Sequence, residues 1–252
     1  MKPPETRYSD YDRFAWFYNK YWGSSSYIDM VITILDDLLL SNLSVDSRIL
    51  DLCCGTGQVA HALMTRGFQV TGVDGSEEML RYARENAPPA EFILADARDF
   101  SLADTYNAAI STYDSLNHIM RIGELATVFQ NVRNVLVEDG LFLFDMNVEE
   151  GYLVRWQGDR SVSFVEDDNA CIARASYDPE EKVGRSDITM FRLEDEVWRR
   201  SDVALFQRAY SEGEVRMALS KAGFSGIAAY DAVKDLGIAG NIGRIFFLAH
   251  KY

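Results

Sequence analysis

Two glycines that follow a mainly apolar stretch are the first residues in this sequence with an evident chemical use. Gly55 and Gly57 lie in residues 54–57, here named the Gly loop, between a strand-like stretch at 48–53 and an amphipathic helical pattern at 58–66. Glycines in such a turn let the backbone approach a ligand closely, because no side chain intervenes. The Gly-x-Gly-x-x-Ala spacing also fits the dinucleotide fingerprint, so several nucleotide-like ligands remain open.

Three carboxylates stand where consecutive predicted strands end. Asp51 precedes the Gly loop, Asp74 ends a strand at residues 69–74, and Asp96 ends another at residues 91–96. The carboxyl ends of parallel strands form the edge where open α/β sheets bind ligands, so we expect the three acids at one site. A carboxylate beside the Gly loop repels a pyrophosphate and attracts a ligand with an ammonium and a sulfonium, as in S-adenosylmethionine. Each acid alone is as well explained as a cap of a helix or turn.

The elements that position these residues alternate along the chain. Strand-like stretches alternate with amphipathic helices over residues 43–147 and again over 209–252, which is typical of a mainly parallel sheet with helices on both faces. Between them, residues 148–208 have the pattern of antiparallel strands. The sequence therefore predicts an α/β core with a β-rich insertion, preceded at residues 1–42 by an aromatic-rich helical segment.

Composition limits the partners of the chain. Its 252 residues include 48% hydrophobic ones, enough for a sizeable core, and carry a formal net charge of −14, which repels nucleic acids and anionic membranes. The three cysteines form no disulfide framework, no Cys or His has metal-ligand spacing, and the polar first ten residues lack a signal-peptide core. We therefore expect a cytoplasmic protein that uses no metal, binds neither nucleic acid nor membrane, and acts on a small molecule.

Several motifs together resemble those of class I S-adenosylmethionine-dependent methyltransferases. Asp51–Gly57 is similar to the first motif of that family, Val73–Leu80 to the second, and Ala95–Ala97 to the third, and residues 134–142 resemble the helix, turn and strand that follow. The resemblance implies a Rossmann-like sheet of seven strands with helices on both faces and an antiparallel last strand. Cys53 departs from the pattern, because the family usually has glycine there.

The same resemblance implies roles in binding S-adenosylmethionine. The backbone of the Gly loop lies against the methionine part, Asp74 holds the ribose hydroxyls, and Asp96 accepts a hydrogen bond from the adenine amino group. Met79 packs against adenine, although a core side chain has the same appearance. The implied cofactor-binding residues are Tyr11, Tyr18, Asp51, Gly55, Thr56, Gly57, Asp74, Gly75, Met79, Asp96, Ala97, Tyr113 and Asp114.

Residues 112–118, just past the fourth predicted strand, are the first candidate for the acceptor side. Methyl transfer from a sulfonium is an in-line displacement, so the protein mainly positions the acceptor, and a base is needed only if the acceptor starts protonated. His118 is a candidate general base, although an ordinary loop histidine looks the same in the sequence. Asn117 and Asp114 are candidates to orient an amine or a hydroxyl.

The aromatic N-terminal segment is the second candidate for the acceptor side. Its pattern from Tyr11 to Tyr18 resembles the lid helix of small-molecule methyltransferases, including deoxysugar and glycine N-methyltransferases. The resemblance implies that one of these tyrosines bonds the cofactor carboxylate or the acceptor, which makes Tyr18 a further catalytic candidate. A helix that only packs on the core has the same pattern. Residues 148–208 either cover the pocket or form the face of a homodimer, and both remain open.

The sequence therefore predicts an enzyme that transfers a methyl group from S-adenosylmethionine to a nitrogen or oxygen of a small-molecule acceptor. A dinucleotide-dependent oxidoreductase is the main alternative, because the Gly loop and Asp74 also fit it, but it leaves Asp51 and Asp96 unexplained. A non-catalytic module that binds S-adenosylmethionine is the third hypothesis.

Overall fold

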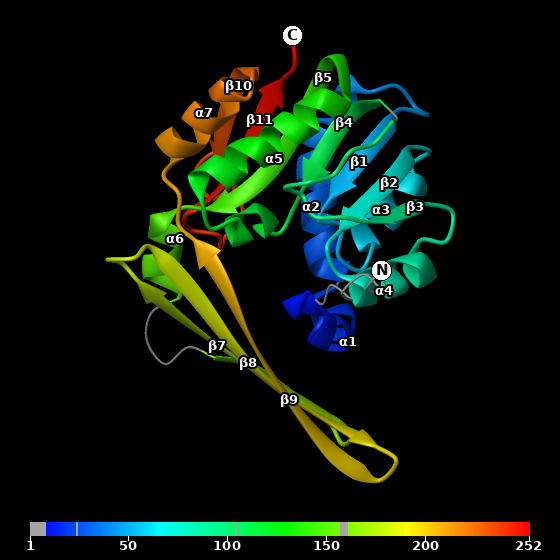
Figure 1. The fold of residues 1–252 in the computed structure, drawn as a ribbon, viewed down its shortest axis with the longest axis vertical. Helices are drawn as coiled ribbons and strands as arrows, with labels where there is room; N and C mark the ends of the chain where they lie inside the picture. The colour runs from blue at the N-terminus through cyan, green and yellow to red at the C-terminus, as the bar shows by residue number, and fades with distance from the viewer. Residues whose placement is uncertain (1–8, 24, 104, 157–160) are drawn as a thin grey trace, which may run out of the picture.

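The largest part of the protein, seen in a computed structural model that describes residues 9–23, 25–103, 105–156 and 161–252, is a seven-stranded sheet. The strand order is β3-β2-β1-β4-β5-β11-β10 (Figure 1), and all neighbours are parallel except that β11 is antiparallel to both β5 and β10. The strands are β1 (Arg48–Leu52), β2 (Gln69–Asp74), β3 (Glu91–Leu94), β4 (Tyr106–Ser111), β5 (Leu136–Asn147), β10 (Ser225–Asp231) and β11 (Arg244–His250). The predicted seven-stranded sheet with an antiparallel last strand is confirmed.

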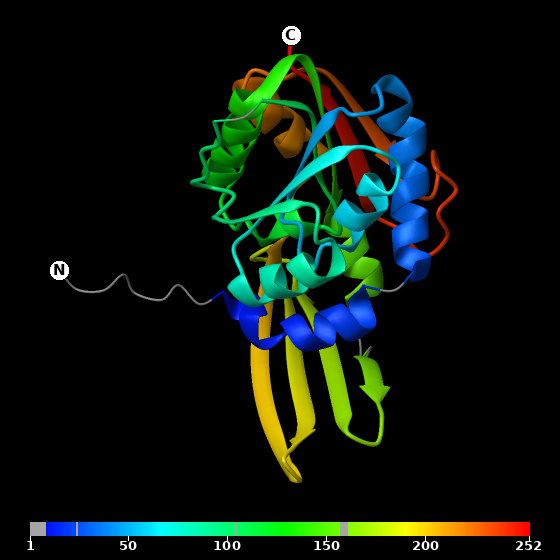
Figure 2. The same cartoon turned by 90° about the vertical axis from the view of Figure 1, so that its right-hand side faces the viewer.

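Helices cover both faces of this sheet, as predicted. An apolar cluster under α5 and α7 lies on one face and a second cluster under α2 and α3 lies on the other, which Figure 2 shows in side view. The helices are α2 (Ser25–Leu38), α3 (Gln58–Met64), α4 (Glu77–Asn86), α5 (Ile122–Val135), α6 (Glu149–Arg155) and α7 (Glu212–Lys221), with the short turns η3 (Leu40–Asn42) and η4 (Ser115–His118). Among the described residues no helix is long and apolar enough to cross a membrane.

Side-chain caps fix where two of these helices begin. Ser211 and Glu214 form a capping box at the start of α7, each side chain accepting the backbone N–H of the other. Ser76 caps α4, because its hydroxyl accepts the N–H of Met79 at 3.1 Å. The second cap matters for the site, since it fixes the turn directly after β2.

The third strand is shorter than the sequence predicted. β3 ends at Leu94, so the expectation that Asp96 ends a strand at residues 91–96 is wrong. Asp96 instead begins a turn, in which its carboxylate accepts the N–H of Arg98 at 2.8 Å and its carbonyl accepts the N–H of Asp99 at 2.9 Å. The side chain therefore stands in a loop beyond the sheet.

Residues 161–208 form a separate antiparallel sheet that projects from the carboxyl ends of the central strands (Figure 1). Its strands pair in chain order as β6 (Ser161–Val165), β7 (Asn169–Asp178), β8 (Val183–Glu194) and β9 (Val197–Arg208). The inner face carries Cys171, Ile188, Met190 and Leu205, which pack in one apolar cluster against the N-terminal segment.

Residues 10–22, named the lid below, lie between the two sheets (Figure 2). They form three short helical pieces in succession, the 3-10 turn η1 (Asp10–Arg13), the α-helical turn α1 (Ala15–Phe17) and the π-helical turn η2 (Tyr18–Trp22). Phe14 and Phe17 are buried against the four-stranded sheet. The part of the predicted N-terminal segment at residues 1–8, with Tyr8, lies outside the described residues.

Candidate active site

The Gly loop has the backbone conformation that its glycines suggest. Gly55 and Gly57 have φ values of +54° and +80°, in the left-handed region that favours glycine. A Cβ on Gly57 would stand 2.9 Å from the Cα of Ala83 in α4, whereas a Cβ on Gly55 would face the ring of Tyr18 at 3.6 Å. The lid therefore covers the exposed side of the loop. Cys53 also has a positive φ of +59°, which costs about 1 kcal/mol relative to a glycine at this position.

Asp51 places a buried carboxyl directly before this loop. The residue is 2% exposed, and its Oδ2 atom has no hydrogen-bond partner among the described residues. Burial and the nearby Asp74 raise its pKa to about 8. With Tyr18, Tyr27 and Thr112 it lines a small cavity of about 30 Å³ beside the loop. A buried polar atom without a partner is costly, so a cationic group placed here would be strongly favoured.

Asp74 ties the end of β2 to the Gly loop. Its Oδ2 accepts the N–H of Gly55 at 2.9 Å, and its Oδ1 accepts the N–H of Ser76 at 2.9 Å. Burial raises its pKa to about 6, although both hydrogen bonds act in the opposite direction. A Cβ on Gly75 would meet only the carbonyl of Ala95, at 3.9 Å, so this turn leaves room for a ligand.

Asp96, the third acid, is paired with a neighbouring arginine. Asp96 forms a two-pronged ion pair with Arg98, with N–O distances of 2.9 and 2.7 Å. Met79 and Ala97 nearby are almost fully buried. All three acids lie within electrostatic reach of Cys53, because after burial the nearby Asp74, Asp51 and Asp96 each raise the pKa of its thiol. The structure thus brings the three acids close to the Gly loop, and the carboxylate of Asp96 is ion-paired with Arg98.

On the acceptor side, the structure pairs Tyr11 of the lid with His118. The Tyr11 Oη and His118 Nε2 atoms are 2.8 Å apart, and His118 Nδ1 is 2.7 Å from the carbonyl oxygen of Phe206 in β9. A carbonyl only accepts, so Nδ1 holds the proton and Nε2 accepts from the Tyr11 hydroxyl. Burial lowers the pKa of His118, which keeps the imidazole neutral at neutral pH, and raises that of Tyr11.

Asp114 and Asn117 are committed to partners within the protein. The Asp114 carboxylate accepts from Gln207 at 2.6 Å and from Arg244 at 2.5 Å. Asn117 is fully buried, and its side chain bonds backbone groups of β5 and β9 at 2.7 to 2.9 Å. These residues hold the loop in place, and neither is free to orient an acceptor in this arrangement.

Asp145, a buried carboxylate that the sequence did not indicate, holds this loop through backbone hydrogen bonds. Asp145 accepts the N–H groups of Tyr113 at 2.7 Å and Asp114 at 2.9 Å, and it pairs with Arg244. Both loop residues have positive φ, +67° and +48°, a strained conformation that these bonds hold. Asp145 lies inside the apolar strand β5 and Arg244 begins β11, and nothing in the sequence near either residue indicates that they pair.

Two further tyrosines surround Tyr113. The ring of Tyr18 meets it edge-on with centroids 6.2 Å apart, and the ring of Tyr27 in α2 meets it at 4.1 Å. The Tyr27 hydroxyl is buried without a hydrogen-bond partner among the described residues and belongs to the lining of the Asp51 cavity. Tyr27 is a candidate ligand-binding residue that sequence reasoning missed, because it precedes the apolar stripe of α2 and stands in no motif.

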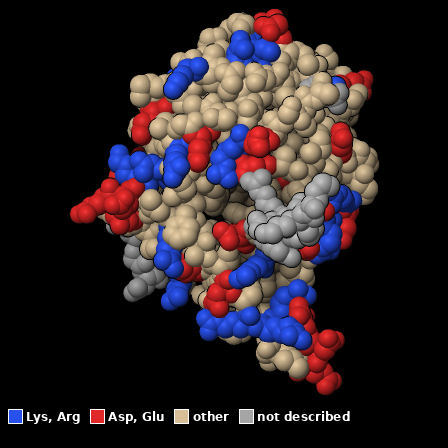
Figure 3. All heavy atoms as spheres, in the orientation of Figure 1, with Lys and Arg blue, Asp and Glu red and all other residues tan. Residues whose placement is uncertain are grey.

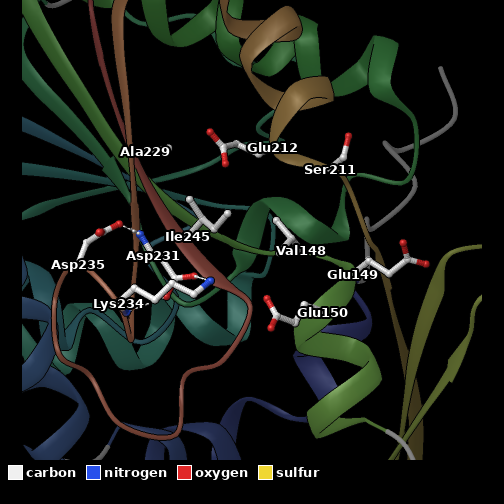
Figure 4. A pocket seen from close by; sticks show the side chains of 10 residues that line it. All are labelled: Val148, Glu149, Glu150, Ser211, Glu212, Ala229, Asp231, Lys234, Asp235 and Ile245. Carbon is white, nitrogen blue, oxygen red and sulfur yellow. Dashed lines mark hydrogen bonds and ion pairs between the residues drawn. The ribbon is translucent and has the colours of Figure 1, made fainter.

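A larger cavity of about 450 Å³ lies outside this site, between α6, α7 and β10 (Figure 4). Acidic side chains dominate its lining, but most already have partners: Glu149 bonds Tyr177 at 3.0 Å, and Asp231 pairs with Lys234 at 3.1 Å. We assign this solvated acidic groove no role in the chemistry.

Known methyltransferases are similar to this chain in sequence. A family model of the methyltransferase domain matches residues 49–140. The putative methyltransferase YqeM of Bacillus subtilis (strain 168) is 29% identical over 215 residues, which cover 84% of this chain and 87% of YqeM. The dTDP-3-amino-3,4,6-trideoxy-alpha-D-glucopyranose N,N-dimethyltransferase of Streptomyces venezuelae is 28% identical over 146 residues, 56% of this chain and 59% of the relative.

A solved structure reproduces nearly the whole architecture. The S-adenosylmethionine-dependent methyltransferase from Clostridium acetobutylicum ATCC 824 superimposes with a TM-score of 0.75 at 24% identity, over 96% of this chain and 99% of that one. The strand order and fold are therefore shared with an S-adenosylmethionine-dependent methyltransferase, and the methyltransferase-domain model matches the part of the chain that holds the Gly loop. Among its relatives it is similar to YqeM over most of both chains.

Proposed function

We propose that the chain transfers a methyl group from S-adenosylmethionine to a nitrogen or oxygen of a small-molecule acceptor. The observation that carries the proposal is the buried carboxyl of Asp51 beside the Gly loop, whose Oδ2 atom has no hydrogen-bond partner in the part of the chain that the structure describes. A pyrophosphate placed there would be repelled by the ionised carboxylate, whereas an ammonium would donate a hydrogen bond to it and a nearby sulfonium would be attracted by its charge.

The residues around the loop fit the rest of that cofactor. Asp74 holds the ribose, because a carboxylate has about four acceptor positions and keeps some of them after accepting the N–H groups of Gly55 and Ser76. Met79 and Ala97 enclose the adenine, with Asp96 at its edge. Tyr18 closes the loop from above, since its ring stands over Gly55.

The acceptor side rests on Tyr11 and His118. When bound, the cofactor would supply a methyl group attached to a cationic sulfur, which is a good leaving group for in-line attack by a lone pair of the acceptor on the methyl carbon. The Tyr11 hydroxyl donates to His118, so its oxygen is free to accept a hydrogen bond from an N–H or O–H of the acceptor. A proton lost by the acceptor passes to the Tyr11 oxygen while the Tyr11 hydroxyl proton passes to His118 Nε2. His118 is therefore the general base, and Tyr11 relays the proton to it.

A small acceptor fits the enclosure better than a macromolecule does. The lid lies between the carboxyl edge of the central strands and the four-stranded sheet, which packs on the lid from the other side. On the face shown in Figure 3, basic side chains are interspersed with acidic ones, and on β9 Arg199 and Arg200 pair with Glu194 and Asp202. The Streptomyces relative named above is an amino-sugar N,N-dimethyltransferase, which supports an amine acceptor here.

The predicted organisation is part of the same proposal. We assign residues 1–42 to a lid unit, 43–147 and 209–252 to the cofactor-binding core, and 148–208 to an insertion that covers the pocket. A cytoplasmic location suits the three cysteines, which are free thiols in the structure.

Direct cofactor binding tests the proposal. We expect the purified protein to bind S-adenosylmethionine and S-adenosylhomocysteine and not NAD, because Asp51 favours a cationic ligand and disfavours a pyrophosphate. Isothermal titration calorimetry with the three ligands measures this. Binding of NAD alone would establish the oxidoreductase alternative, and binding of S-adenosylhomocysteine without methylation of any amine or hydroxyl acceptor would leave a non-catalytic module.

The Tyr11–His118 relay predicts a selective loss of turnover. Tyr11→Phe should lower kcat by about 100-fold, because general-base assistance contributes on that order, and should change cofactor affinity by less than about threefold. Initial rates on a panel of amino sugars, together with calorimetry, separate the two quantities. Tyr82→Phe is the matched control, since Tyr82 lies on α4, where its ring contacts the Arg81 guanidinium. Parent-like turnover in folded Tyr11→Phe would exclude the relay.

A further inference from the structure

Asn19 of the lid is the meeting point of two amide side chains from the core. Its Oδ1 atom accepts from Gln58 Nε2 at 3.0 Å and from Asn86 Nδ2 at 2.8 Å. Gln58 is the first residue of α3, directly after Gly57, and Asn86 is the last residue of α4. One oxygen of the lid thus joins the two helices that flank the Gly loop.

The same two amides hold the loop itself. The Thr56 hydroxyl donates to Gln58 Oε1 at 2.6 Å, and the Thr56 carbonyl accepts from Asn86 Nδ2 at 2.7 Å. Thr56 stands between the two glycines and is fully buried. Because the Gln58 N–H₂ group points to Asn19, the Gln58 oxygen must point the other way. Asn19 thus sets the side-chain orientation in which Gln58 Oε1 accepts the hydrogen bond from the Thr56 hydroxyl.

Gly23 provides independent support that this arrangement is built into the lid. A Cβ on Gly23 would stand 2.4 Å from Gln58 Nε2 and 2.9 Å from Gln58 Cδ, so a larger residue would displace that side chain. The φ of Gly23 is −76°, which any residue adopts, so the backbone does not require glycine here. The missing side chain leaves the passage through which Gln58 reaches Asn19.

The lid has other polar attachments, but they reach other elements. Tyr11 bonds His118, and Asp12 accepts from the Ser76 hydroxyl at 2.5 Å. Asn19 is the attachment that reaches the Gly loop, over which Tyr18 lies. Tyr18 and Trp22 of the lid line the Asp51 cavity beside the loop, so lifting the lid opens that cavity and breaks both hydrogen bonds of Asn19.

We infer that Asn19 is a positioning residue that clamps the lid onto the Gly loop and thereby sets the residence time of the bound cofactor. The inference rests on the proposed function, since it takes the occupant of the loop to be S-adenosylmethionine or its product. Asn19 acts through its hydrogen bonds to Gln58 and Asn86 and has no direct role in the methyl transfer.

Replacing Asn19 tests the clamp. Asn19→Ala removes two hydrogen bonds and should speed dissociation of S-adenosylhomocysteine by about tenfold. Asn19→Asp keeps the accepting oxygen and should stay within about threefold of the parent rate. Stopped-flow displacement followed by tryptophan fluorescence measures the rate, because Trp22 of the lid lines the Asp51 cavity. A structural role without clamping predicts equal rates for both variants, which would overturn the inference.

A second measurement needs no cofactor. Trypsin cleavage after Lys20, identified by mass spectrometry, should be faster in cofactor-free Asn19→Ala than in the parent, because a lifted lid exposes that bond. Gly23→Ala should behave like Asn19→Ala, whereas the control Gly123→Ala, whose Cβ would meet nothing within 4 Å, should behave like the parent. A parent that binds no S-adenosylhomocysteine overturns the proposed function. Unchanged cleavage of folded Asn19→Ala overturns the clamp itself.

Discussion

Asp74→Ala should weaken binding of S-adenosylhomocysteine by about 2–4 kcal/mol, the largest loss that we expect from a single substitution. The carboxylate has two functions that the variant loses together. It offers charge-assisted hydrogen bonds to the ribose hydroxyls, and it holds the Gly loop by accepting the N–H of Gly55. Isothermal titration calorimetry at fixed, moderate salt measures the loss.

The fold should survive this substitution, because Asp74 stands at the end of β2 and its neighbours in the sheet pair through backbone groups. Glu85→Ala is the matched control: it removes one acid from α4, in an exposed ion pair with Arg81, and should bind the cofactor as the parent does. If Asp74→Ala, with a parent-like thermal transition, kept its affinity within about threefold, Asp74 would not be the ribose ligand.

Asp51→Asn should weaken binding of S-adenosylmethionine by about 1–3 kcal/mol, because the amide keeps the size of the side chain and loses its charge. The sign distinguishes the two classes of ligand. A pyrophosphate ligand would bind the variant as well as the parent or better, since asparagine never carries the negative charge that repels it. Titration of both proteins with S-adenosylmethionine and with NAD therefore decides between the two readings of the Gly loop.

The pKa of Asp51, about 8, adds a pH dependence to this prediction. In the cofactor-free protein the acid is protonated below that pH, and a cationic ligand binds the ionised form. The affinity of the parent should therefore rise with pH up to about pH 8 and then level off, with proton release on binding at neutral pH. Asp51→Asn should show neither effect, which calorimetry in buffers of different ionisation enthalpy measures.

Stability without the cofactor should change in the opposite direction. The pKa of Asp51 is raised above its unfolded value of about 3.9, so its stabilising contribution is present below that pH and is lost as the pH rises through about 8. Asp51→Asn should therefore raise the thermal midpoint of the cofactor-free protein more at about pH 9 than at about pH 5. A variant that binds S-adenosylmethionine as tightly as the parent would make Asp51 a structural residue.

The class of fold and the centre of the site could be predicted from local patterns. Alternating strand and helix periodicities indicate which elements form, and these short-range preferences hold in the structure for nearly every element of the seven-stranded sheet. Gly55 and Gly57 mark positions of positive φ, which few other residues adopt. Asp51 and Asp74 follow from their places at strand ends, because strand direction alone brings those ends to one edge.

Contacts between distant segments could not be predicted in this way. Tyr11 and His118 meet because the lid docks against η4, and Asp114 meets Gln207 because β9 returns to the core. Nothing local to these residues specifies such a partner; it depends on how the lid and the four-stranded sheet pack on the core. The same holds for Asn19: its side-chain oxygen accepts from residues of two different helices, and no sequence pattern near Asn19 indicates these hydrogen bonds. Backbone conformation and strand direction are properties of neighbouring residues, whereas the pairing of polar side chains is a property of the assembled chain.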